Sequence, residues 1–277
     1  MRFVRAHSAP SAAIDQLGRW REPVCPLTVG LKPSFDKLVS RRISRIAEQV
    51  GAPTRGAGKP CSVNVEVIFT PHAQGLLDHL ARRYPWLVGF PTAAHPPRFR
   101  GPIESWYLTA TRPSESWTPP ESVNVAANPG GGGLYSRLSD DAEQVAGLPG
   151  GAEIDVPGAG APSGAVSGWL TAGLESEFAY VLIIVDAHQV EGYSLGAVSD
   201  YLAMLSLTHV TPPETCNALP SITDLLAPRC TEDPKPSKLT AEDAAYLKAL
   251  YSSSLEMNLN IEEGEVRDRM VRAIAGG

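Results

Sequence analysis

The residue types that could do chemistry gather in the C-terminal half of the chain, between Ser199 and His209. A zinc hydrolase of the H-E-x-x-H type needs two histidines four residues apart on one face of a helix, with a glutamate beside the first as general base. Laid on that pattern, Ser199 and Ala203 replace the two histidines, Asp200 replaces the glutamate, and only His209 matches, as the third histidine. A catalytic zinc takes three protein ligands, so this stretch predicts no bound metal, no cofactor and no zinc-dependent catalysis.

The segments after His209 also fit the order of motifs in such zinc hydrolases. Residues 219–222 (LPSI) fall where such enzymes carry their Met-turn, without the methionine, and residues 239–251 are similar to the last helix of the matrixin-like branch. Together these segments resemble a degenerate zincin or metzincin-like metallopeptidase domain, in element order over 20–255 and in motif over 195–251. The resemblance implies a zincin-like fold and a non-catalytic binding or structural role. The stretches NVEVIFT, YVLIIVDAHQVEGYSLGAVSDYLAML and LPSITDLL also resemble an uncharacterised family of exported proteobacterial proteins, which implies no activity.

An ordinary core helix explains the stretch 195–207 without reference to any peptidase. Its apolar residues Leu195, Val198, Leu202 and Leu205 already have helical spacing. Both interpretations predict a helix. They differ in whether this helix corresponds to the zinc-binding helix of a metallopeptidase or is an unrelated core helix.

A hydrolase with an unconventional site is the alternative function. Asp186 and His188 follow a long apolar run, and their spacing of two would place them on one face if the strand continued. With His209 they could form a site beneath the Gly-rich insertion. The alternative interpretation is an aspartate that caps a turn beside an exposed histidine.

Aromatic side chains are concentrated between residues 84 and 117, among prolines. Trp86, Trp106 and Tyr107 could line a groove for a protein, peptide or glycan partner. Such residues also fasten loops to a core, and the sequence leaves both interpretations open.

The four cysteines form two pairs in the sequence, Cys25 with Cys61 and Cys216 with Cys230. We expect two disulfides, and with them an oxidising compartment, either the periplasm or the outside of the cell. No signal peptide is visible in this chain. The alternative is four buried thiols, because cysteine packs as a small apolar residue.

The periodicity predicts strands near 24–29, 62–69, 103–111 and 178–185, and helices near 33–50, 71–84, 195–207, 241–255 and 262–274. The second strand alternates and is expected to be half-buried, whereas the run 178–185 is expected to be buried on both faces. In the first helix, Phe35, Leu38, Val39, Arg42, Ile46 and Val50 are expected on one face. The order of elements predicts an α+β fold.

The domain organisation that follows is simple. Residues 1–18 are expected to form a flexible arm, and residues 19–277 a single domain with a flexible Gly/Pro-rich insertion at about 118–168. The insertion is expected to be a surface excursion or a flap over a ligand.

Charge and hydropathy exclude two classes of partner. The chain has 30 acidic and 24 basic residues and a net charge of −6, which argues against binding nucleic acid through phosphate contacts. No apolar run approaches the roughly 18 residues of a membrane-spanning helix.

Overall fold

The structure is a computed structural model that describes residues 2–11, 14–56, 61–92, 95–113, 174–231, 234–254 and 258–276. The elements in this part are α1 (Arg2–His7), β1 (Pro26–Val29), α2 (Pro33–Val50), β2 (Val65–Thr70), α3 (Ala73–Arg83), η1 (Pro85–Val88), β3 (Ile103–Pro113), β4 (Leu174–Asp186), α5 (Leu195–Leu207), η2 (Ile222–Leu226), α6 (Ala241–Ser252) and α7 (Leu259–Ala275). The expected insertion at 118–168 lies outside the described residues. The mixed α+β fold predicted from the sequence is confirmed.

The strands form one mixed sheet with the order β1-β2-β4-β3. β1, β2 and β4 are parallel, and β3 runs antiparallel to β4 along the other edge. The long strand β4 is therefore paired on both sides. Its apolar run was predicted to be buried on both faces, and Val181 to Val185 are fully buried.

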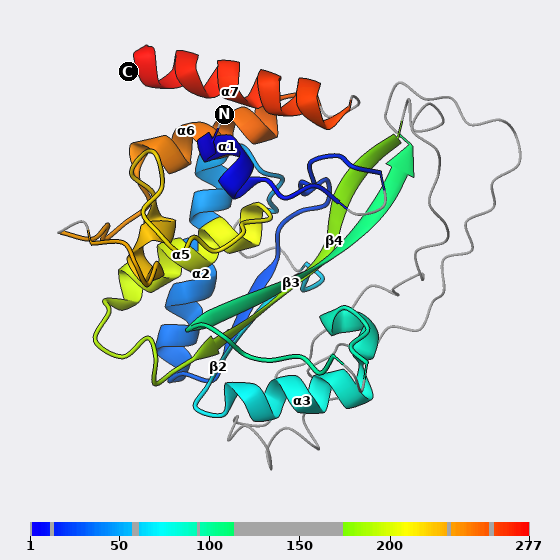
Figure 1. The fold of residues 1–277 in the computed structure, drawn as a ribbon, viewed down its shortest axis with the longest axis vertical. Coiled ribbons are helices and arrows are strands. Elements are labelled where there is room, and N and C mark those ends of the chain that lie inside the picture. The colour runs from blue at the N-terminus through cyan, green and yellow to red at the C-terminus, as the bar shows by residue number, and fades with distance from the viewer. Residues whose placement is uncertain are drawn as a thin grey trace, which may run out of the picture.

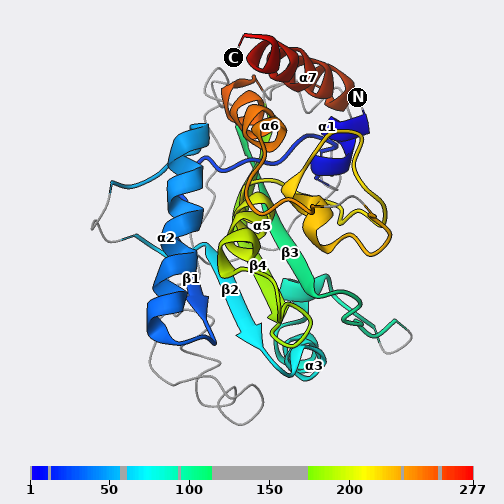
Figure 2. The same cartoon turned by 90° about the vertical axis from the view of Figure 1, so that its left-hand side faces the viewer.

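Helices cover both faces of this sheet (Figure 1). One face, which carries Val67, Ile183 and Val185, packs against α2 and α5 in the larger of two apolar clusters. The other face, which carries Ile68 and Ile184, packs against α3 and η1 in the smaller cluster. Figure 2 shows α5 between α2 and the sheet's far edge, so α5 is the central helix of its layer.

Helix α2 forms as predicted, but its buried face is shorter than expected. It begins with proline in its first turn, where proline is favoured, and ends at Gly51 in the left-handed conformation. Val39, Ile46 and Val50 are buried, whereas Phe35 and Leu38 are 46% and 44% exposed. Apolar periodicity in the first two turns of α2 therefore does not mean burial.

Strand β2 was predicted to be half-buried, and this is wrong. All six of its residues are buried, including Glu66, which the alternation had placed on a solvent-facing side. Alternating polarity along a strand predicts a solvent-exposed face of the sheet only when no second layer of structure packs on that face. Here the smaller apolar cluster covers the face that carries Glu66.

The N-terminal residues were predicted to be a flexible arm, and this is also wrong for the described ones. Residues 2–7 form α1, whose Phe3, Val4 and His7 are buried, and Leu17 is buried further along. Two backbone hydrogen bonds, from the amide of residue 9 to the carbonyl of His209 and from Thr211 to the carbonyl of residue 6, fix the segment to the end of α5. Short polar sequences without periodicity can be ordered by distant partners, which a local pattern does not reveal.

The remaining helices lie close to their predicted ranges. Helix α5 spans the predicted residues. Helix α6 begins with a capping box, in which Thr240 accepts from the amide of Asp243 while the Asp243 carboxylate accepts from the amide of Thr240. In α7, Val266 and Met270 are buried, but Ile274 is 45% exposed.

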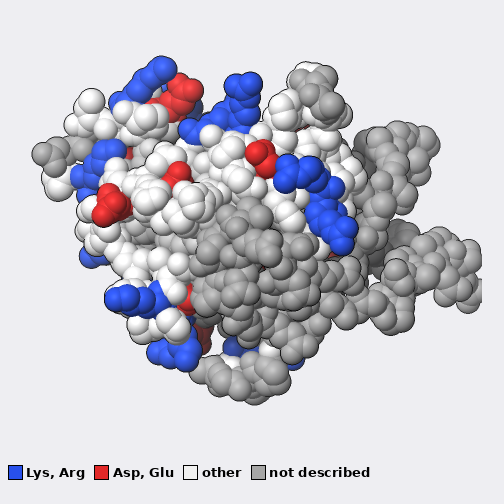
Figure 3. Space-filling view, turned by 90° about the horizontal axis from the view of Figure 1, so that it is seen from below, with Lys and Arg blue, Asp and Glu red and all other residues white. Residues whose placement is uncertain are grey.

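Charged residues of both signs are mixed on the face seen from below, where α3 lies in Figure 1 (Figure 3). On this face the described atoms show no extended area of one sign. None of the helices in the described ranges is long and apolar enough to cross a bilayer.

Candidate functional site

Helix α5 holds the residues that the zinc pattern singled out. Ser194 caps its N-terminus by accepting a hydrogen bond from the amide of Ala197. From Ala197 to Leu207 every residue of the helix is buried, including Ser199 and Ala203. The Ser199 hydroxyl donates to the carbonyl of Leu195, a local bond within the helix. Neither position therefore presents a donor to an open cleft.

Asp200 is fully buried and occupied by partners of its own. Its carboxylate forms a two-point ion pair with the guanidinium of Arg42 on α2, with 2.8 Å between Nη2 and Oδ2, and it accepts a 2.7 Å bond from the amide of Leu239. This hydrogen bonding raises the pKa of Arg42. The ion pair joins α2, α5 and the segment that leads into α6. A general base must be free to take a proton from water, and this carboxylate is committed to a cation.

His209 lies just after α5 with its ring against Tyr107, at a centroid distance of 4.2 Å. Burial lowers the pKa of His209, so the imidazole is neutral at neutral pH. The Tyr107 hydroxyl donates to the carbonyls of Leu205 and Thr208 and so fixes the end of α5 on β3. Within the described ranges, no group of three or more His, Cys, Asp or Glu side chains is placed to hold a metal ion.

The alternative site of Asp186, His188 and His209 is not assembled. Asp186 ends β4 and caps the following turn by accepting a bond from the amide of the exposed His188. His209 lies on Tyr107, which pairs with Val181, and the five residues from there to Asp186 span roughly 16 Å. The two groups lie near opposite ends of α5, with the body of the helix between them.

Asp186 also borders a groove of about 590 Å³, which includes His72 and Gln74 at the start of α3. Ligands of open parallel sheets often lie at this edge, beyond the carboxyl ends of the strands. The Asp186 carboxylate is already used by its own turn, where it also accepts from the side-chain amide of Gln189. The groove therefore offers few free groups to fix a ligand.

The three aromatic candidates do not share one surface. Trp86 and Trp106 pack against the smaller apolar cluster beside α3, whereas Tyr107 packs against the larger cluster beside α5. Neighbouring residues in a strand point to opposite faces, which separates Trp106 from Tyr107. Any aromatic groove on the α3 side would include the two tryptophans without Tyr107.

A buried polar network, missed by the sequence reasoning, connects α1 to η2 and α6. The His7 ring uses Nδ1 to donate to the carbonyl of Phe3, and its Nε2 lies 3.1 Å from the hydroxyl of Ser221 and 3.2 Å from that of Thr223. The Ser221 hydroxyl donates to Asp243 at 2.7 Å. Burial lowers the pKa of His7, which leaves the ring neutral and able to accept at Nε2.

These are the residue types of a nucleophilic triad, but their order is different. In a triad the aspartate orients the histidine and the histidine takes the serine proton. Here Asp243 binds Ser221, and His7 gives its Nδ1 proton to a backbone carbonyl. All three side chains are fully buried, so a substrate has no access and the network is structural. The sequence carries no local signal for it, because His7 and Ser221 are separated by 214 positions.

A second buried group lies on the opposite face of the sheet. Glu66 is fully buried, its Oε2 accepts a hydrogen bond from the hydroxyl of Tyr180, and its Oε1 has no hydrogen-bond partner among the described residues. Burial raises the pKa of Glu66 to about 7, and the bond from Tyr180 opposes this change. A carboxyl with this pKa suits proton transfer. With no exposed surface, however, Glu66 has no route to a substrate.

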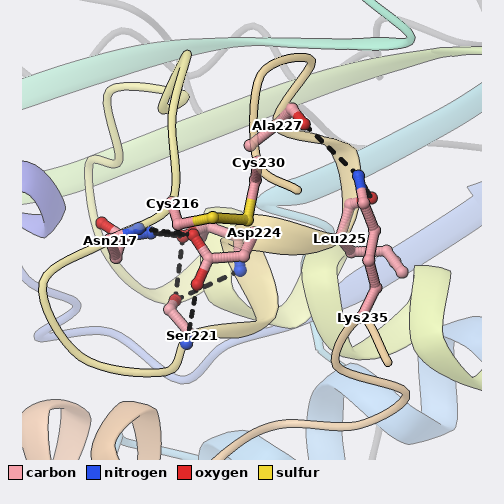
Figure 4. Close-up of a disulfide and its surroundings, with 9 residues drawn as sticks. Cys216, Asn217, Ser221, Asp224, Leu225, Ala227, Cys230 and Lys235 are labelled. Carbon is pink, nitrogen blue, oxygen red and sulfur yellow. Dashed lines mark hydrogen bonds between the residues drawn. A yellow bond between two sulfur atoms is a disulfide. The ribbon is translucent and has the colours of Figure 1, made fainter. Parts of the chain in front are cut away.

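The loop between α5 and α6 is fixed by one of the two predicted disulfides, both of which are confirmed. Figure 4 shows the bond between Cys216 and Cys230 beside Asp224, whose carboxylate accepts from the backbone and side-chain amides of Asn217 at 2.8 and 2.7 Å. The Lys235 ammonium donates to two backbone carbonyls at the end of η2. The residues predicted at the position of a Met-turn, 219–222, lie within this disulfide-closed loop.

Comparison of the chain with protein-family models, with curated proteins and with solved structures gives no match.

Proposed function

We propose that this chain is an exported, non-catalytic domain of zincin-like fold that acts by binding a partner or as a structural module. The observation that carries the proposal is that three residues of helix α5, at the positions of the zinc ligands and the general base, are buried and cannot bind zinc. Where a peptidase would hold its zinc, Ser199 and Ala203 are buried in the core, and the carboxylate of Asp200 is paired with Arg42. Ser199, whose hydroxyl donates to the carbonyl of Leu195, and Ala203 both lack the nitrogen with which histidine binds zinc.

The order of the elements supports the zincin-like part of the proposal. The resemblance calls for a helix, a strand, a second helix, a buried strand, the active-site-type helix, a loop and a closing helix. In this chain α2, β2, α3, β4, α5 and α6 follow in that order, with η1 and β3 between α3 and β4 and a loop with η2 before α6. His209 follows α5 at the position that the third ligand would take, and its ring rests on Tyr107.

The two disulfides support export. Structural disulfides persist in oxidising compartments and are rare in the cytosol of mesophiles. Cys25–Cys61 joins the start of β1 to the segment before β2, and Cys216–Cys230 closes the loop before α6. We therefore place the domain in the periplasm or outside the cell, with a protein, peptide or glycan as its partner.

Metal analysis of the purified chain tests the loss of the zinc site. The oxidised protein is incubated with one equivalent of zinc, passed through a desalting column and measured by inductively coupled plasma mass spectrometry. We expect far less than one zinc per chain, with the same value for His209→Ala. Retention of one zinc per chain that disappears in His209→Ala would refute the proposal.

Thiol counting tests the compartment. The protein is isolated from cells under trapping conditions and alkylated with and without reductant, and the added mass is measured. We expect labelling of Cys25, Cys61, Cys216 and Cys230 only after reduction. Full labelling without reductant would contradict export.

A further inference from the structure

A groove of about 540 Å³ lies between the N-terminal half of α2 and the start of α5. Figure 2 shows these two helices side by side on the viewer's side of the sheet. Arg41, Arg42 and Arg45 line it from α2, and Gly196 and Asp200 line it from α5. The volume lies in the range of small-molecule pockets, roughly 300–1,000 Å³.

The positive charge of this groove is not balanced by any carboxylate among the described residues. Asp200, the one carboxylate among the lining residues, is neutralised by its ion pair with Arg42. Arg41 and Arg45 are exposed, and within the described part of the chain neither has a carboxylate partner. Two guanidinium groups therefore remain, with a charge of about +2.

The two arginines also repel each other. Residues four apart on a helix lie on the same face, and like charges at this spacing destabilise the helix. An anion between Arg41 and Arg45 would remove this repulsion. The ion pair of Arg42 with Asp200 anchors the neighbouring turn of α2 to α5, so the two free arginines project from a fixed helix.

We propose that this groove binds an organic phosphate monoester. Such a group carries about −1.5 to −2 charges at neutral pH, which matches the charge of Arg41 and Arg45 together. The planar guanidinium donates two parallel hydrogen bonds to phosphate oxygens. The hydroxyls of Ser34 and Ser237 line the same groove and supply further donors. A single carboxylate would leave one of the two arginines uncompensated.

The organic part of the ligand has apolar surface to rest on. Leu38 lines the groove one turn before Arg41 and Arg42 and is 44% exposed, and Phe35, three residues earlier on the same helix face, is 46% exposed. These two exposed side chains offer the organic part of the ligand an apolar surface to contact. The groove is thus charged towards Arg45 and apolar towards Phe35.

This inference goes beyond the proposed function and does not depend on it. The loss of the zinc site is tested by metal content, whereas the groove is tested by anion binding, so either can fail alone.

Isothermal titration calorimetry at neutral pH and low ionic strength, with phenyl phosphate as the probe, tests the proposal. We expect one saturable site per chain, with phenyl phosphate binding at least ~10-fold more tightly than inorganic phosphate or benzoate. Arg41→Ala with Arg45→Ala should weaken phenyl phosphate at least ~10-fold. Leu38→Ser should weaken phenyl phosphate but leave inorganic phosphate unchanged. Because these side chains are exposed, the variants should keep the wild-type circular dichroism and melting temperature.

The matched control is Arg82→Ala with Arg83→Ala, which removes the same charge from two exposed arginines on α3. We expect this control to bind phenyl phosphate as the wild type does. Three results would overturn the proposal: no saturable binding, an equal loss in both double variants, or benzoate binding as tightly as phenyl phosphate.

Discussion

Replacing Glu66 by glutamine measures how much the burial of an ionised carboxylate in the sheet lowers the free energy of unfolding. Burial raises the pKa of Glu66 from its ordinary value of 4.5 to about 7, while the unfolded chain keeps the ordinary value. At about 1.4 kcal/mol for each pH unit between these two pKa values, the difference corresponds to roughly 3.5 kcal/mol. The folded state binds the proton more tightly, so this contribution is fully present below about pH 4.5 and is lost as the pH rises through 7.

Glutamine resembles the protonated carboxyl in shape and keeps an oxygen that can accept from Tyr180. Glu66→Gln and the wild type should therefore differ little in free energy of unfolding at pH 4.5. Near pH 8 the variant should be more stable by about 3 kcal/mol. The measurement is urea unfolding of the oxidised proteins, followed by tryptophan fluorescence, at a series of pH values.

The control is Glu48→Gln, because Glu48 is exposed on α2 and the change has the same chemistry. Because Glu48 is exposed, the change should leave the free energy of unfolding close to the wild-type value in the same series of measurements. Tyr180→Phe removes the hydrogen bond that lowers the pKa of Glu66, so the pKa of Glu66 should rise further in this variant. The decrease in the variant's free energy of unfolding with rising pH should therefore continue to a higher pH than in the wild type. If the difference between Glu66→Gln and the wild type stays constant from pH 4.5 to about 8, the assigned pKa is wrong.

Two further predictions concern the ion pair and the loop disulfide. Arg42→Ala leaves the buried carboxylate of Asp200 without its cation, and because the Arg42 side chain is 35% exposed we expect a loss of about 2–3 kcal/mol in urea unfolding. Arg45→Ala should cost less than about 0.5 kcal/mol, and equal losses in the two variants would contradict the role of the pair. Cys216→Ser with Cys230→Ser opens a loop closed over 14 positions and should cost about 3 kcal/mol, seen as a lower melting temperature by calorimetry. An unchanged melting temperature would show that the disulfide does not stabilise this loop.

The sequence predicted the elements whose signals are local. Helix α5 shows apolar spacing and α6 a capping box, and each signal lies within a few residues of the structure that it specifies. The continuous apolar run in β4 likewise predicted burial on both faces. The pairs Cys25–Cys61 and Cys216–Cys230 followed from sequence proximity alone.

The prediction failed where burial depends on distant elements. Glu66 looked solvent-facing because its strand alternates, and only the second apolar layer buries it. Leu38 looked buried because it continues the periodicity of α2, but its side chain is 44% exposed and lines an open groove beside α5. At the candidate site, the sequence identified the absence of ligands at Ser199 and Ala203. It could not show that Asp200 is bound to Arg42, 158 positions away.

The N-terminal segment is held by the last helix of the chain. The amide of Leu17 donates to the carboxylate of Glu262, the guanidinium of Arg5 pairs with Glu263, and Figure 1 shows α1 beneath α7. Because α1 is made before α7, at roughly 5–20 residues per second, the N-terminal segment must wait for α7 to be synthesised before it finds these partners. The N-terminal segment is therefore fixed late in folding, and Phe3 and Val4, which are buried in the final structure, are apolar side chains left exposed while it waits.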